Sequence, residues 1–145
     1  MNDRIEKTVE LAAPVSRVWR ALTDHRQFCT WFRAELDGPF VPGQTVRGHS
    51  TYPGHEDARF EIAVLRIEPE HRFSFSWPAY DGADETCHTL VEFTLEATPT
   101  GTLLRVVESG FDKLPSARRL DAFRDNEGGW DIQVGNIATH LSHAS

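Results

Sequence analysis

The stretch from Gln44 to Ser109 constrains the fold most, because five short runs with strand character follow one another there. Apolar and polar residues alternate in most of these runs, and turns rich in glycine and proline separate them. The runs are QTVRGHSTY, ARFEIAVLRI, RFSFSWPAY, TCHTLVEFTLEA and TLLRVVES. Because such short turns join neighbouring strands as hairpins, the pattern predicts an antiparallel meander.

One more strand and three helices are predicted on either side of the meander. Residues 4–11 alternate like a strand with one buried face, and helical spacing begins at Pro14. A second short helix follows, which carries Phe28, Trp31 and Phe32. The last apolar stripe has helical spacing and consists of Leu120, Phe123, Trp130, Val134, Ile137 and Leu141. We therefore predict one α+β domain, residues 1–145, in which a curved antiparallel sheet packs against two short helices and one long C-terminal helix.

The negative net charge argues against two classes of binding partner. The 145 residues include 15 Lys and Arg and 22 Asp and Glu, which gives a net charge of −7. Nucleic acids and anionic membranes need a basic surface, so neither is expected as a partner. No signal peptide and no apolar run of about 20 residues is present, and two distant cysteines indicate reduced thiols. We expect a cytoplasmic protein.

Motifs for metal binding or catalysis are weak. His49, His55, Glu56 and Asp57 lie close together, but their spacing matches no zinc signature and is typical of an exposed hairpin. The chain has no Gly-x-Ser-x-Gly elbow and no glycine-rich phosphate loop. We therefore predict no metal, no cofactor and no catalytic residue, and leave open whether the protein is an enzyme.

Four stretches, in the same order along almost the whole chain, resemble one known family. They are APVSRVWRALTDHRQFCTWF, VLRIEPEHRFSFSW, VEFTLEATPTGTLLRVVESGF and NEGGW. They are similar to the activator of heat-shock protein 90 ATPase homologue family of small bacterial proteins, in the START/Bet v 1-like (SRPBCC) superfamily. The resemblance implies the helix-grip fold, which usually encloses a ligand cavity between the sheet and the last helix.

The inner face of such a sheet offers candidate ligand-binding residues. Small-molecule pockets are mostly apolar and aromatic with a few polar groups, although an ordinary core has a similar composition. The candidates are Trp31, Phe60, Phe75, Trp77, Val91, Phe93, Glu108 and Trp130. Glu108 follows the phase of Leu104 and Val106, so its carboxylate could anchor a ligand or act as an acid or base. Alternatively, it is a strand-end residue that has reached solvent.

Two adjacent glycines, Gly128 and Gly129, precede Trp130 within the predicted helix. Each costs about 1 kcal/mol relative to alanine there. They would let the helix bend, approach the sheet or leave space beside itself, with Trp130 directed into the interior. The alternative is a packing accommodation without a cavity.

These observations favour a protein that binds a small lipophilic molecule. The resemblance also allows an enzyme of cyclase, dehydratase or hydrolase type that acts on a hydrophobic or aromatic substrate. A third possibility is stimulation of a chaperone ATPase. In the family that role is associated with an additional N-terminal domain, whereas this chain begins at its first strand, so we discount a chaperone interaction and keep it as the second alternative. A free sheet edge would allow a homodimer.

Overall fold

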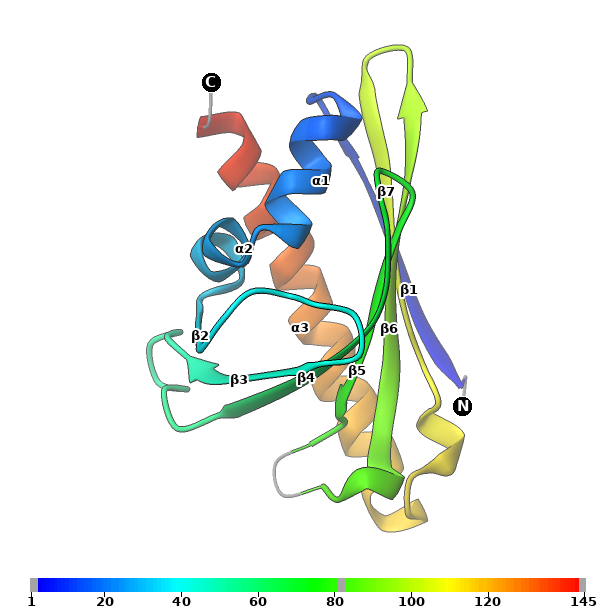
Figure 1. Cartoon of the computed structure of the whole chain (residues 1–145). Helices are drawn as coiled ribbons and strands as arrows, with labels where there is room; N and C mark the ends of the chain where they lie inside the picture. Colours follow the sequence, from blue (N-terminus) through cyan, green and yellow to red (C-terminus); the bar gives the residue numbers. More distant parts are fainter. Residues whose placement is uncertain (1–2, 81–82, 144–145) are drawn as a thin grey trace.

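The computed structural model describes residues 3–80 and 83–143 and consists of one sheet and three helices (Figure 1). The strands are β1 (Arg4–Leu11), β2 (Ala34–Leu36), β3 (Thr45–Ser50), β4 (Arg59–Glu68), β5 (Arg72–Pro78), β6 (His88–Thr98) and β7 (Gly101–Ser109). The helices are α1 (Val15–Thr23), α2 (His25–Phe32) and α3 (Ser116–His143), with short 3₁₀ turns at Glu85–Cys87 and Phe111–Lys113.

All seven strands pair antiparallel in the order β1-β7-β6-β5-β4-β3-β2. The strand order is that of a meander from β2 to β7, closed by β1, which pairs with β7 at one edge. The helices lie on one face of this sheet, and α3 runs along it with α1 and α2 beside its C-terminal half (Figure 1). This arrangement confirms the predicted α+β helix-grip fold.

The α3 backbone lies close to β1, α1 and α2. Between α3 and the central strands, large aromatic side chains fill the interior: the ring centroids of Trp130 on α3 and Phe93 on β6 are 5.7 Å apart. The α3 backbone therefore lies close to the sheet at its β1 edge, whereas over the central strands side chains fill the space beneath the helix. This is the region in which the resemblance predicts a ligand cavity.

The two short helices form a compact corner beside α3. The Asp24 side chain caps α2 by accepting a hydrogen bond from the backbone N–H of Arg26. Trp31 is 3% exposed and donates its indole N–H to the carbonyl oxygen of Ala21 on α1, at 2.8 Å. These contacts fix the direction of α2 and place Phe32 at the edge of the interior aromatic rings.

Two details differ from the sequence-based prediction. The three-residue strand β2 was not expected, because so short a segment shows no alternation of its own. Leu120 was placed in the apolar stripe of the last helix but is 46% exposed, whereas the nearby Ala122 is 4% exposed. Near the N-terminal end of this helix, Ala122 and not Leu120 therefore faces the core.

The double glycine is not explained by close packing. A Cβ atom at Gly128 or Gly129 would have no heavy atom of a neighbouring element within 4 Å. Close approach of the helix to the sheet, one of the predicted explanations, is therefore excluded at both positions. Gly128 is exposed and Gly129 is half-buried, so the open space at Gly128 is solvent and not part of the interior.

We expect Gly128→Ala and Gly129→Ala each to raise the free energy of unfolding by about 0.5–1 kcal/mol, because alanine restricts the unfolded chain and meets no obstacle here. Urea denaturation would measure both variants. Gly48→Ala is the matched contrast: its Cβ would collide with the carbonyl oxygen of Glu35, so this variant should be destabilised. Destabilisation by the α3 substitutions would show that the helix needs its glycines for packing.

Candidate functional site

Glu108 is the buried polar centre of the interior. It lies on β7, where it is in register with Val91 of β6 and Ile5 of β1, and its side chain shares the inner face with Leu104 and Val106. Its exposed fraction is 0%. The alternative that Glu108 has reached solvent at the strand end is therefore wrong, and the phase predicted from the alternation is right.

Four side chains donate hydrogen bonds to the Glu108 carboxylate. Oε2 accepts from Trp77 Nε1 at 2.9 Å, from Asn126 Nδ2 at 3.1 Å and from the hydroxyl of Thr89. Oε1 accepts from Trp130 Nε1 at 2.8 Å. Indole and amide N–H groups can only donate, so the arrangement matches an ionised carboxylate. β5, β6 and α3 thus all meet at this one group.

Burial raises the pKa of Glu108 above the ordinary value of 4.5, and the hydrogen bonds from Thr89, Trp77, Trp130 and Asn126 oppose this shift. Among residues 3–80 and 83–143, Glu108 forms no ion pair. Within the described part of the chain, the ionised form of Glu108 is therefore stabilised by neutral donors alone.

This pKa shift predicts a pH-dependent stability. Because the folded protein holds the Glu108 proton more tightly than the unfolded chain, this contribution is complete below pH 4.5 and is lost as pH rises through the folded-state pKa. The free energy of unfolding of the native protein, relative to Glu108→Gln, should therefore fall as pH rises. Urea denaturation of both proteins between about pH 4 and pH 8 would measure this difference. A difference that grows with pH would mean that the donors outweigh burial.

Aromatic rings surround the carboxylate. Trp77 and Trp130 are stacked with centroids 5.8 Å apart, and Phe32 lies 6.0 Å from Trp77 and 6.2 Å from Trp130. Phe60 stacks on Trp77, with the two ring centroids 6.2 Å apart. Phe75 and Phe93 complete the cluster from β5 and β6. We call these six residues, Phe32, Phe60, Phe75, Trp77, Phe93 and Trp130, the aromatic cluster.

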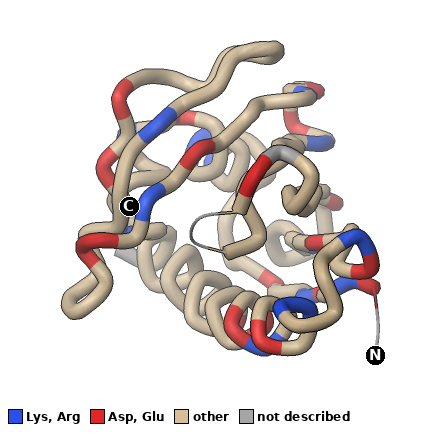
Figure 2. Tube along the Cα trace, turned by 90° about the horizontal axis from the view of Figure 1, so that it is seen from below, with Lys and Arg blue, Asp and Glu red and all other residues tan. Residues whose placement is uncertain are grey.

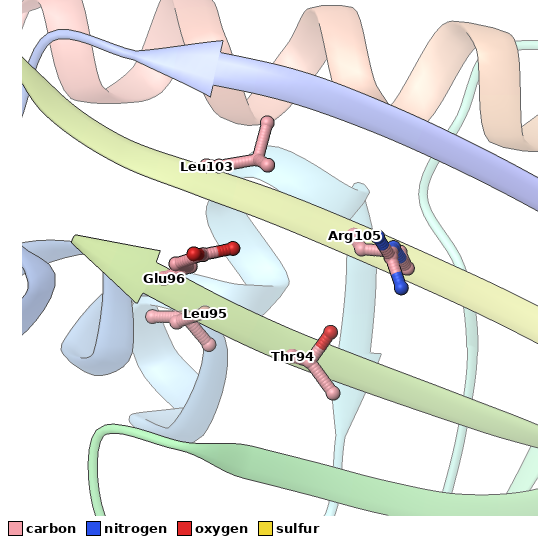
Figure 3. Close-up of a pocket in the computed structure, with 5 residues that line it drawn as sticks. All are labelled: Thr94, Leu95, Glu96, Leu103 and Arg105. Atoms are coloured by element: carbon pink, nitrogen blue, oxygen red, sulfur yellow. The ribbon is translucent and has the colours of Figure 1, made fainter. Parts of the chain in front are cut away.

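Two surface hollows lie outside this cluster. One is on the outer face of β6 and β7, lined by Thr94, Leu95, Glu96, Leu103 and Arg105 (Figure 3). The other lies where β1 leads into α1 and faces the β6–β7 turn. In contrast, Phe75, Phe93 and Trp130 are at most 3% exposed. The interior is therefore closely filled by its own side chains in this structure.

The structure brings most of the predicted site residues together. Phe60, Phe75, Trp77, Phe93 and Trp130 belong to the aromatic cluster, and Val91 is the fully buried register partner of Glu108. Trp31 does not belong to this group of predicted residues. Its indole N–H donates a hydrogen bond to α1, and its ring packs against Phe28 and Phe32.

Sequence reasoning missed three residues at this site, namely Phe32, Thr89 and Asn126. Thr89 has the same phase on β6 as Val91 and Phe93, so the alternation could have revealed it. Asn126 precedes Trp130 by four residues, which places both on one face of α3. Neither pattern led to a prediction of a site residue, because a single threonine or asparagine does not by itself indicate a binding site.

Metal-binding and acid–base groupings are not seen in the described ranges. No group of three or more His, Cys, Asp or Glu side chains there could hold a metal ion. His49 instead lies 3.6 Å from Glu35 of the neighbouring strand β2. The hydrogen-bond partners of Glu108 are tryptophan, threonine and asparagine, so no second titratable group faces it through a hydrogen bond.

The charged residues lie around the outside of the fold. Figure 2 shows both signs interspersed along the strands, loops and helices rather than a single basic face. No helix in the described residues is long and apolar enough to cross a membrane.

Solved structures with the same fold are known. DynU16, a protein of the dynemicin biosynthetic locus, is 27% identical with a TM-score of 0.80; the match covers 100% of this chain and 49% of DynU16, so the chain spans about half the length of that protein. MLL2253 from Mesorhizobium loti is 24% identical with a TM-score of 0.80, and 98% of each chain is covered. The Aha1 dimer from Colwellia psychrerythraea is 17% identical with a TM-score of 0.75 over 98% of each chain.

No protein with curated annotation matches this chain. A family model does match, from residue 12 to residue 142, and it describes the "Activator of Hsp90 ATPase homolog 1-like protein". This range includes both short helices, all strands except β1, and nearly all of α3. The chain therefore belongs to the Activator of Hsp90 ATPase homolog 1-like family.

Proposed function

We propose that this protein binds a small lipophilic molecule between the sheet and α3, with Glu108 as the polar anchor. The observation that carries the proposal is a fully buried carboxylate, held by four neutral donors and enclosed by the aromatic cluster. A buried charge usually costs stability, and an apolar replacement of similar volume is often neutral or stabilising. A carboxylate kept in such a position is therefore a candidate for binding a ligand.

Binding at this site requires the aromatic rings to separate. Trp130 is the ring that follows the double glycine, and no neighbouring element packs closely against Gly128 or Gly129. A local shift of α3 there would move the Trp130 ring while the strands keep their pairing. DynU16 belongs to a biosynthetic locus, a setting in which small organic compounds are handled, and this agrees with the proposal.

Native mass spectrometry of freshly purified protein, with organic extraction of any bound compound, is the first test. A stoichiometric small molecule supports the proposal. Titration with lipophilic compounds should also raise the melting temperature and quench the fluorescence of Trp77 and Trp130, which face each other at 5.8 Å. Leu90→Ala, on the outer face of β6, is the control and should bind as the native protein does. A clean apo mass with no thermal shift for any compound would contradict the proposal.

The geometry favours binding over acid–base catalysis. General acid–base chemistry commonly pairs titratable groups with different pKa values, and Glu108 has no titratable hydrogen-bond partner within the described residues. The alternative of a cyclase, dehydratase or hydrolase therefore has less support here than a binding role. Stimulation of a chaperone ATPase is linked to this chain only by the name of the family.

A second copy of this chain is a further proposed partner. The Colwellia psychrerythraea relative was solved as a dimer. Within residues 3–80 and 83–143, β1 and β2 are the two edge strands of the sheet, and each has one side without a paired strand. Light scattering after size-exclusion chromatography would determine the oligomeric state, and a monomer at all concentrations would contradict the proposal.

A further inference from the structure

The carboxylate at the centre of the site has no partner of opposite charge in the described chain. The donors to Glu108 are two indoles, one amide and one hydroxyl, all of them neutral. Buried charges in proteins are usually paired with an opposite charge or a metal ion. A neutral lipophilic ligand would leave this charge uncompensated, whereas a cationic ligand would neutralise it.

The two carboxylate oxygens differ in their remaining capacity. Oε2 already accepts three hydrogen bonds, from Trp77, Thr89 and Asn126. Oε1 accepts one, from Trp130. A carboxylate offers about two acceptor positions on each of its two oxygens, so one position on Oε1 is not used by these donors. Oε1 is therefore the atom at which a ligand can add a donor or replace the indole of Trp130.

The two tryptophans that bond the carboxylate form a closed triangle of rings with Phe32. The centroids of Phe32, Trp77 and Trp130 lie 5.8–6.2 Å from one another, each ring beside the other two. Aromatic faces attract cations, and tryptophan does so most strongly. The two cation–π pairs of the described residues lie elsewhere, at Arg33 on Tyr52 and Arg118 on Tyr80. No cation–π pair of the described chain therefore involves these three rings, and Trp77 is stacked on Phe60 and Trp130.

We infer that the ligand is a lipophilic organic cation, an amine whose ammonium N–H groups bond Glu108 Oε1 while its apolar body lies among Phe32, Trp77 and Trp130. This inference rests on the proposed function and adds the chemical class of the ligand. The carboxylate supplies charge, the rings supply a cation-binding surface, and the filled interior supplies a dry environment. An ammonium loses its hydration shell on binding there, so both attractions are needed together.

The test compares two probes that share one apolar body, 4-phenylbutylamine and 4-phenylbutan-1-ol. At about pH 7.5 the amine is protonated, because alkylammonium groups titrate near pH 10. Calorimetric titration of the native protein at about 0.15 M salt should give about tenfold tighter binding of the amine. Glu108→Gln keeps the size of the side chain but removes its charge, so it should bind the two probes equally.

Glu96→Gln is the matched control. Glu96 is exposed on the outer face of β6, and its replacement changes the net charge of −7 by the same amount as Glu108→Gln does. This variant should keep the tenfold preference for the amine. Loss of the preference in Glu96→Gln would assign it to the overall negative charge of the protein and overturn the inference.

The outcomes separate this inference from the proposed function. If the native protein binds both probes equally, the inference of a cationic ligand is overturned, while the proposed lipophilic site is retained. If it binds neither probe, the result contradicts both the inference and the proposed function. If Glu108→Gln does not fold, the salt dependence of the native protein's preference for the amine tests the inference instead. A preference that persists at about 1 M salt supports a buried ion pair, because buried pairs are little screened. A preference that disappears at that salt concentration overturns the inference.

Discussion

Glu108→Ala is expected to lower the free energy of unfolding by about 3 kcal/mol. The substitution leaves the indole N–H groups of Trp77 and Trp130, the Thr89 hydroxyl and the Asn126 amide without their shared acceptor. An unsatisfied buried donor costs about 1–3 kcal/mol, and removal of the buried charge offsets part of that sum. Urea denaturation at neutral pH measures the effect.

Glu96→Ala is the control for this experiment, because Glu96 is an exposed glutamate one strand away and its loss should change stability by less than about 0.5 kcal/mol. The opposite result for Glu108 would also be informative. If the Glu108→Ala protein is more stable than the native one, burial of the charge destabilises the fold by more than the four hydrogen bonds stabilise it. In that case the carboxylate would be kept at the expense of stability.

Phe75→Ala should lower the free energy of unfolding by about 3–5 kcal/mol, the usual cost of emptying a phenylalanine site in a packed core. Phe75 is 0% exposed, and its ring lies 5.2–6.3 Å from the rings of Trp77, Phe73 and Phe93. Chemical denaturation measures the loss, with Leu90→Ala on the outer face as a control that should cost far less.

This measurement separates two interpretations of the aromatic cluster. A tightly packed interior gives the full cost, because the surrounding side chains cannot close the hole. A loss near 1 kcal/mol would show that Phe75 already borders an open cavity, since little packing would be removed. An apolar cavity left by Phe75→Ala should also bind benzene, as dry cavities of this kind do.

The fold was predictable because its elements have strong local signals. Alternation along β1 and β4–β7 and helical spacing along α3 each identify a buried face without knowledge of tertiary structure. The exceptions are positions where tertiary contacts decide. The strand β2 exists because it pairs with β3, and Leu120 is exposed because Ala122 faces the core at that end of α3.

The candidate site was predictable only in part. The phase of β7 identified Glu108, and the residue types identified most of the aromatic cluster. Whether the carboxylate is buried could not be read from β7 alone, because burial depends on α3 and on β5 reaching it from elsewhere in the chain. The Asn126 bond spans 18 residues and the Trp77 bond spans 31, so no local pattern reports either contact.

The two tryptophans that share Glu108 also provide a way to follow motion of the helix. Trp77 belongs to the sheet and Trp130 belongs to α3, yet each directs its indole proton to the same carboxylate. In deuterated solvent, an excursion of α3 that leaves the strands paired would release the Trp130 proton first. Global unfolding would release both protons at one rate. The ratio of these two exchange rates therefore measures how often the helix leaves the sheet while the rest of the protein stays folded.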